Sequence, residues 1–114
     1  MVAFSRTLGT RPFLTTEWVL AEFLVFYSAA GEVTRQRAAA KTRQILQEPR
    51  IHVLSPSQAL FLDGLVLYES RLDKHYSLTD CSSMEVMKRQ RLTEALTNDR
   101  HFLQEGFQIL FQEN

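Results

Sequence analysis

The chain has 114 residues, of which 45% are hydrophobic and 11% aromatic. This length predicts one domain, and the apolar content is sufficient for a buried core, which excludes an intrinsically disordered protein. Thirteen basic residues balance thirteen acidic ones, which excludes a globally basic nucleic-acid binder but not a local basic face. The single cysteine, Cys81, cannot form an internal disulfide, so a cytoplasmic location fits. The longest apolar run is about ten residues and contains Glu22, too short to span a membrane.

Turn and capping residues divide the first half of the chain into short elements. Residues Val2 to Leu8 are expected to be the end of a helix that Gly9 terminates. The elements expected next are a buried strand at 12–15, an apolar helix capped by Thr15 or Thr16 that runs to about Ala29, a polar helix from about Thr34 to Gln47, and a strand at 51–54.

The second half continues this alternation. A helix is expected to begin at a capping box formed by Ser55 and Gln58 and to end near Ser70. The elements that follow are a helix from Ser77 to about Arg91, a strand at 95–97, a short helix or turn at 101–105 and a strand at 107–111. Short strands that alternate with helices predict an α/β fold with a mostly parallel sheet flanked by helices.

Three carboxylates are candidates for a functional site, and each has a structural alternative. Glu22 lies within an apolar helix, where an ionised side chain is costly without a partner, although it could lie at the helix edge or pair with an arginine. Asp80 follows Ser77 at the spacing of a capping box. Asp99 follows a short apolar strand, where it could cap the next helix. Sites in open α/β sheets also gather at that position, beyond the carboxyl ends of the strands.

Three acids at the ends of three elements are less easily explained by capping alone. Mg²⁺ binds through a few carboxylates, retained waters and phosphate oxygens, and a metal ion can activate water for phosphodiester cleavage. Glu22, Asp80 and Asp99 are therefore the candidate catalytic and metal-binding residues, and the pattern points to a nuclease.

Other charged and titratable residues carry less information. A basic stripe on the polar helix is either a solvated face or a surface for RNA phosphates or a protein partner. The stripe consists of Arg35, Arg37, Lys41 and Arg43. No metal is assigned to the histidines, which show no ligand spacing: His52, His75 and His101.

Two segments resemble the PIN domain family. Residues Asp73 to Leu110 contain SLTDCS followed by LTNDRHF and resemble the carboxyl-terminal half of a PIN domain, with VapC-type toxins the most similar members. The stretch PFLTTEWVLAEF, Pro12 to Phe23, resembles the family's second strand and the helix after it. The two segments together cover nearly the whole chain in one colinear order.

The resemblance implies a three-layer, PIN-like α/β fold for a single domain over residues 1–114. It implies a single-strand ribonuclease that depends on Mg²⁺ or Mn²⁺, with Glu22, Asp80 and Asp99 as its acidic site residues. It also implies a toxin of a toxin–antitoxin pair, with RNA and a cognate antitoxin as partners and a possible homodimer.

The sequence departs from the family at its start. PIN domains open with a central strand that ends in an aspartate, and no such element precedes Val2. We therefore expect the first strand to be missing, with the loss of one metal ligand and of the hydrogen-bond partner of two neighbouring strands. Either the protein begins upstream of Met1, which we favour, or the chain is inactive or takes the strand from another chain. The alternative functions are an inactive PIN module that binds RNA or an antitoxin without cleavage, and an unrelated α/β scaffold whose acids only cap helices.

Overall fold

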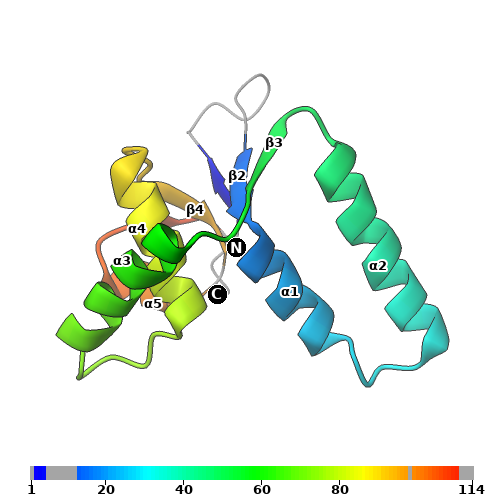
Figure 1. Ribbon diagram of the computed structural model, residues 1–114, viewed down its shortest axis with the longest axis horizontal. Coiled ribbons are helices and arrows are strands. Elements are labelled where there is room, and N and C mark those ends of the chain that lie inside the picture. Colours follow the sequence, from blue (N-terminus) through cyan, green and yellow to red (C-terminus); the bar gives the residue numbers. More distant parts are fainter. Residues whose placement is uncertain (1, 5–12, 98, 111–114) are drawn as a thin grey trace.

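The structure, a computed structural model, describes residues 2–4, 13–97 and 99–110 (Figure 1). Helices and strands alternate along most of the chain. The elements are β1 (Val2–Phe4), β2 (Phe13–Thr16), α1 (Glu17–Phe26), α2 (Glu32–Gln47), β3 (Ile51–Leu54), α3 (Gln58–Ser70), α4 (Leu78–Arg89), β4 (Glu94–Leu96), α5 (Arg100–Gln104) and β5 (Gln108–Ile109). Among these residues, no helix has the length and apolar character needed to cross a membrane.

Side-chain caps begin α1 and α4 as the sequence predicts. At α1, the Thr16 hydroxyl accepts a hydrogen bond of 3.3 Å from the Val19 N–H. At α4, the Ser77 hydroxyl accepts from the Asp80 N–H at 3.0 Å, and the Asp80 carboxylate accepts from the Ser77 N–H at 3.1 Å. These bonds satisfy backbone donors that the first turn of a helix leaves unpaired.

The predicted start of α3 is wrong by two residues. Ser57, not Ser55, is the N-cap, and its hydroxyl accepts a hydrogen bond of 3.1 Å from the Leu60 N–H. Serine is equally suited to both positions, so the local sequence does not distinguish them.

The sheet has five strands in the order β3-β2-β1-β4-β5. Strand β2 is parallel to β3, and β4 is parallel to β5. Strand β1 is antiparallel to both of its neighbours, β2 and β4. The other four strands therefore run in one direction, which confirms the prediction of a mostly parallel α/β sheet.

The central position of the sheet differs from the expectation. Val2 to Phe4 form strand β1, so the predicted helix is wrong for these residues, and the rest of that helix lies outside the described residues. Ala3 pairs with Leu14 of β2 and with Ala95 of β4. The expectation that these two strands lack a partner is therefore wrong. Because β1 runs antiparallel, its carboxyl end lies away from the sheet edge at which β2 and β4 end.

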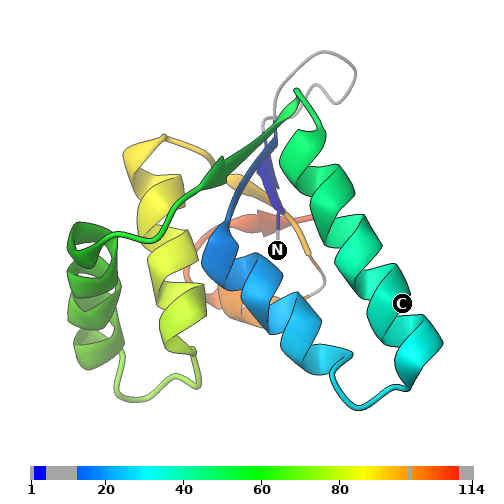
Figure 2. The ribbon, with the colours of Figure 1, turned by 45° about the vertical axis from the view of Figure 1, so that its right-hand side comes forward.

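The helices form two groups around the sheet. Figures 1 and 2 show the hairpin of α1 and α2 on one side of the strands and α3 with α4 on the other. The main hydrophobic core lies in the second group and consists of Leu67, Tyr76, Cys81, Met84, Met87, Ala95, Phe102, Phe107 and Ile109. By contrast, α1 and α2 bury one side chain each, Leu20 and Ala38. The hairpin therefore contributes little to the core.

A charge network centred on Glu105 ties α3, α4 and α5 together. The Glu105 side chain is only 6% exposed. Its carboxylate accepts two hydrogen bonds from the Arg71 guanidinium, at 2.8 and 2.9 Å, and one of 3.0 Å from Lys88. The Tyr76 hydroxyl donates a further hydrogen bond of 3.1 Å. The carboxylate is thus almost fully satisfied, as a buried charge requires.

The network shifts the pKa values of its members. Burial opposes ionisation of Glu105, but the hydrogen bonds from Arg71, Lys88 and Tyr76 and the charge of Lys88 outweigh it and lower its pKa to about 2. Burial, together with the hydrogen bond to Glu105, raises the pKa of Tyr76 to about 12. Glu105 is therefore ionised and Tyr76 neutral across the physiological range.

Candidate metal centre

A cleft of about 330 Å³ contains all three acids predicted from the sequence. The cleft lies between α1 and the amino-terminal ends of α4 and α5. It is lined by Val19, Glu22, Phe23, Phe26, Tyr27, Thr79, Asp80, Ser83, Thr97, Asp99 and Phe102. Tertiary packing therefore brings three acids from separate elements to the walls of one cleft.

Asp80 and Asp99 are each positioned by a helix start. Asp80 is held by the capping box with Ser77. Asp99 caps α5, where its carboxylate accepts a hydrogen bond of 2.9 Å from the His101 N–H, and its own N–H donates to the Thr97 hydroxyl at 3.0 Å. Both structural alternatives are thus present in the fold. The capping hydrogen bonds do not use every lone pair of the two carboxylates. Both residues also line the cleft.

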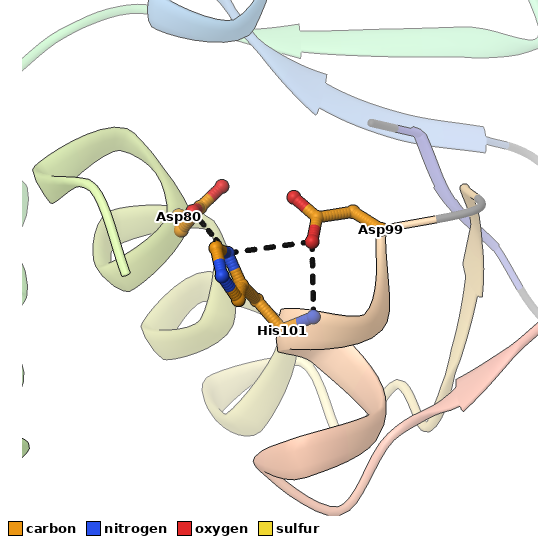
Figure 3. Close-up of side chains that lie close together, drawn as sticks. All are labelled: Asp80, Asp99 and His101. Carbon is orange, nitrogen blue, oxygen red and sulfur yellow. Dashed lines mark hydrogen bonds and ion pairs between the residues drawn. The ribbon is translucent and has the colours of Figure 1, made fainter. Parts of the chain in front are cut away.

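His101 joins the two aspartates (Figure 3). Its Nδ1 lies 3.3 Å from Asp80 Oδ2 and 3.3 Å from Asp99 Oδ1. Each of the three residues offers one possible ligand atom, and these three atoms lie within 4.8 Å of one another. His101, to which the sequence analysis assigns no metal, thus lies beside both aspartates.

Glu22 lies apart from this group. It is exposed on α1 and lines the same cleft, so the interpretation of Glu22 as a residue at the edge of its helix is consistent with the structure. Because the Glu22 side chain is exposed, its ionised carboxylate carries no free-energy cost of burial. Glu22 can therefore add negative charge to the cleft without being one of the clustered residues.

Ser83 is a buried polar residue in the wall of the cleft. It lies on α4, one turn after Asp80, and is 2% exposed. Its hydroxyl and that of its neighbour Ser82 both lack a hydrogen-bond partner among the described residues, and both atoms are almost fully inaccessible to solvent. Buried hydroxyl groups are normally paired, because an unpaired one costs free energy.

Cys81, two residues before Ser83, is a core thiol. Burial, reinforced by the Asp80 charge, raises the pKa of its thiol to about 11, so it is not a nucleophile.

A second hollow lies beside the acidic cleft, between α1 and α2. It has a volume of about 230 Å³ and is lined by Phe23, Tyr27, Thr34, Arg37, Ala38 and Lys41. Phe23 and Tyr27 also line the acidic cleft, and their rings make an edge-to-face contact with centroids 5.2 Å apart. Two of the four basic residues of the predicted stripe, Arg37 and Lys41, therefore line a hollow that shares two aromatic residues with the acidic cleft.

Comparison with known proteins supports the fold. No protein-family model and no curated protein matches the sequence. Among solved structures, the chain is similar to the crystal structure of VapC20 from Mycobacterium tuberculosis, a toxin that cleaves the sarcin–ricin loop. The TM-score is 0.73 at 22% sequence identity, and the match covers 82% of this chain and 70% of that one. The fold is that of a PIN domain.

The residues that the PIN fold gathers here fit a divalent cation. Neighbouring ligands on an octahedral ion with bonds of about 2.1 Å lie about 3 Å apart. The two separations of 3.3 Å between His101 and the aspartates are close to this value. The donor set therefore suits a hydrated metal ion.

The sequence contains a local signal for the position of His101. His101 is two residues after Asp99, and a residue at that position of a short helix lies beside the capping side chain. The pattern Asp-x-His at a predicted helix start thus places an imidazole next to the candidate acid in the PIN fold. A search for the short ligand spacings of zinc sites does not find this group, because the other partner, Asp80, lies on a different helix.

Proposed function

We propose that this protein is a metal-dependent endoribonuclease that hydrolyses phosphodiester bonds of single-stranded RNA. The observation that carries the proposal is the convergence of Asp80, Asp99 and Glu22 on one cleft, with the first two joined by His101. The PIN fold, shared with a toxin that cleaves RNA, supports it. We further propose that the chain is one domain and acts in the cytoplasm as the toxin of a toxin–antitoxin pair.

The side chains divide the work of such a site. Asp80 and Asp99 offer carboxylate oxygens that hold a Mg²⁺ or Mn²⁺ ion, and Glu22 orients water in its hydration shell. A bound cation supplies charge stabilisation for the attacking and leaving oxygens of the phosphodiester. The apolar wall formed by Val19 and Phe102 limits the access of bulk water from that side.

The hollow between α1 and α2 provides a place for the RNA backbone. Arg37 and Lys41 are exposed cations able to neutralise phosphates. The rings of Phe23 and Tyr27 lie between these cations and the acids, where unpaired bases can stack on them. An RNA strand that crosses the aromatic pair therefore has one phosphate near the cations and another near the metal ligands.

Arg37→Gln is expected to weaken single-stranded RNA binding about 3- to 10-fold and to reduce the dependence of log Kd on log salt concentration by about 0.7, the contribution of one phosphate contact. Binding is measured by fluorescence anisotropy in a chelator, which prevents cleavage. Arg43→Gln is the matched control: Arg43 is exposed on the same helix but does not line the hollow. Equal losses in both variants would mean that binding follows net charge and not this surface.

The α1–α2 hairpin also offers an apolar surface to a protein partner. Val25, Phe26 and Val33 are 71%, 79% and 61% exposed, and exposed apolar patches of this kind mark interaction sites. We propose that a cognate antitoxin covers this face. Because Phe26 also lines the acidic cleft, a partner bound there can restrict access to the site.

A binding module without catalytic activity is the second candidate. The direction of β1 favours it, because in the described part of the chain the central strand brings no acid to the carboxyl edge of the sheet. Such a module binds RNA or an antitoxin and cleaves nothing. The two candidates share the fold and the surface around the cleft, so only a measurement of cleavage separates them.

The deciding experiment incubates the purified chain with end-labelled single-stranded RNA of mixed sequence. Cleavage is expected with Mn²⁺ or Mg²⁺, is expected to stop in EDTA and to return when the cation is added in excess. Cleavage that persists in EDTA indicates a metal-independent contaminant or mechanism and contradicts the proposal. RNA that is bound but intact under every cation supports the second candidate.

A further inference from the structure

The position of His101 is determined by contacts on three sides. It is the second residue of α5, where its backbone N–H binds the capping carboxylate of Asp99. Its ring packs against Tyr76, with centroids 5.4 Å apart. Tyr76 is in turn held by its hydrogen bond to Glu105. The imidazole is therefore positioned both by the capping residue Asp99 and by the buried side chain of Tyr76.

The ring directs one nitrogen toward the acids. Nδ1 is 3.3 Å from a carboxylate oxygen of each aspartate, and Figure 3 shows it between them. The His101 side chain is 30% exposed, and those of Asp80 and Asp99 are 17% and 41% exposed. The three ligand atoms are thus close together and partly shielded, and two of the three residues, Asp80 and Asp99, line the cleft.

We propose that His101 Nδ1 is a third protein ligand of the cation, and that the site therefore prefers Mn²⁺ to Mg²⁺. This inference rests on the metal site of the proposed function and adds a ligand and a selectivity to it. Mg²⁺ takes oxygen ligands almost exclusively, whereas imidazole nitrogen binds first-row transition ions more strongly. Two carboxylates with one imidazole leave about three positions of an octahedral ion for water and a phosphate oxygen.

The simpler alternative is that His101 only makes a charged hydrogen bond with the aspartates and leaves when a cation binds. In that case the ion is held by oxygen atoms alone, and replacement of His101 affects Mn²⁺ and Mg²⁺ to the same extent. The two possibilities differ in whether a nitrogen atom is bonded to the metal, which can be observed directly.

The test is pulsed electron paramagnetic resonance of the whole protein loaded with one equivalent of Mn²⁺. In the wild type, we expect coupling between the Mn²⁺ ion and a directly bonded ¹⁴N nucleus. The coupling is expected to disappear in His101→Gln. It is expected to remain in the double variant His52→Gln/His75→Gln, because these two histidines are exposed and distant in sequence from His101. By calorimetry, His101→Gln is expected to weaken Mn²⁺ binding about 10-fold and Mg²⁺ binding less than 3-fold.

Each outcome decides the proposal. Mn²⁺ that binds without nitrogen coupling overturns the role of His101 and leaves the ribonuclease proposal standing. Coupling that persists in His101→Gln assigns the nitrogen to another residue and also overturns it. If the folded wild type binds neither Mn²⁺ nor Mg²⁺, the metal site itself fails, and the proposed function fails with it. If His101→Gln does not fold, coupling that the wild type shows and the double variant retains still assigns the nitrogen to the remaining histidine, and coupling lost in the double variant overturns the proposal.

Discussion

Glu105→Gln is expected to lower the free energy of unfolding by about 2–3 kcal/mol at pH 7. The substitution leaves Arg71 and Lys88 close together without the carboxylate that pairs with both. The estimate stays below the value for a fully buried ion pair, because the side chains of Arg71 and Lys88 are 37% and 40% exposed and water screens them. Urea denaturation followed by circular dichroism measures the change.

The pH dependence of this effect has a defined sign. The pKa of Glu105 is lowered from 4.5 to about 2 in the folded protein. Its contribution to stability is therefore complete above pH 4.5 and decreases as the pH falls toward 2. The difference between the wild type and Glu105→Gln is expected to shrink over the same window.

The matched control for Glu105 is Asp73→Asn. Asp73 pairs with Lys74 at 3.4 Å, but its side chain is 76% exposed, so its removal is expected to change stability by less than about 1 kcal/mol. A Glu105→Gln protein as stable as this control, or a difference that does not depend on pH between 2 and 5, would show that the network contributes nothing measurable.

Asp80→Asn and Asp99→Asn are each expected to reduce metal-dependent RNA cleavage by about 10²- to 10³-fold, which corresponds to about 3–4 kcal/mol of lost transition-state stabilisation. Asparagine is isosteric with aspartate and caps helices equally well. The hydrogen bonds that begin α4 and α5 should therefore remain, and the thermal midpoint should change little. The expected loss is thus of charge and of metal binding, and not of the fold.

The comparison between these variants and Glu22→Gln tests how much each acid contributes to the rate of RNA cleavage. Glu22 is exposed and lies outside the group that includes His101, so its loss is expected to reduce cleavage only about 10-fold, as for a residue that supports the ligands. Rates are measured with end-labelled RNA at saturating Mn²⁺, and Asp73→Asn is the control. If Asp80→Asn and Asp99→Asn cleave at the wild-type rate, the assignment of the site is wrong.

The success of prediction from the sequence varied with the range of the interactions involved. The capping box of Ser77 and Asp80 was predicted correctly, because all its atoms lie within one helical turn. Strand β3 was also predicted correctly, since Pro49 and Pro56 bound a short apolar run. The prediction failed for Val2 to Phe4, a three-residue apolar segment too short to show a helix or strand period. Its strand conformation depends on β2 and β4, which offer hydrogen-bonding edges on both sides.

The candidate site shows the same division. The sequence alone selected Glu22, Asp80 and Asp99 as candidates, because acids at the ends of apolar elements are conspicuous when read along the chain. It also determined the α/β class, through the alternation of short strands and helices. Only the tertiary structure decided that the three acids line one cleft and that His101 lies between two of them. These relations depend on how α4 packs against α5 over the core, and such distances between elements are not encoded by residue spacing along the chain.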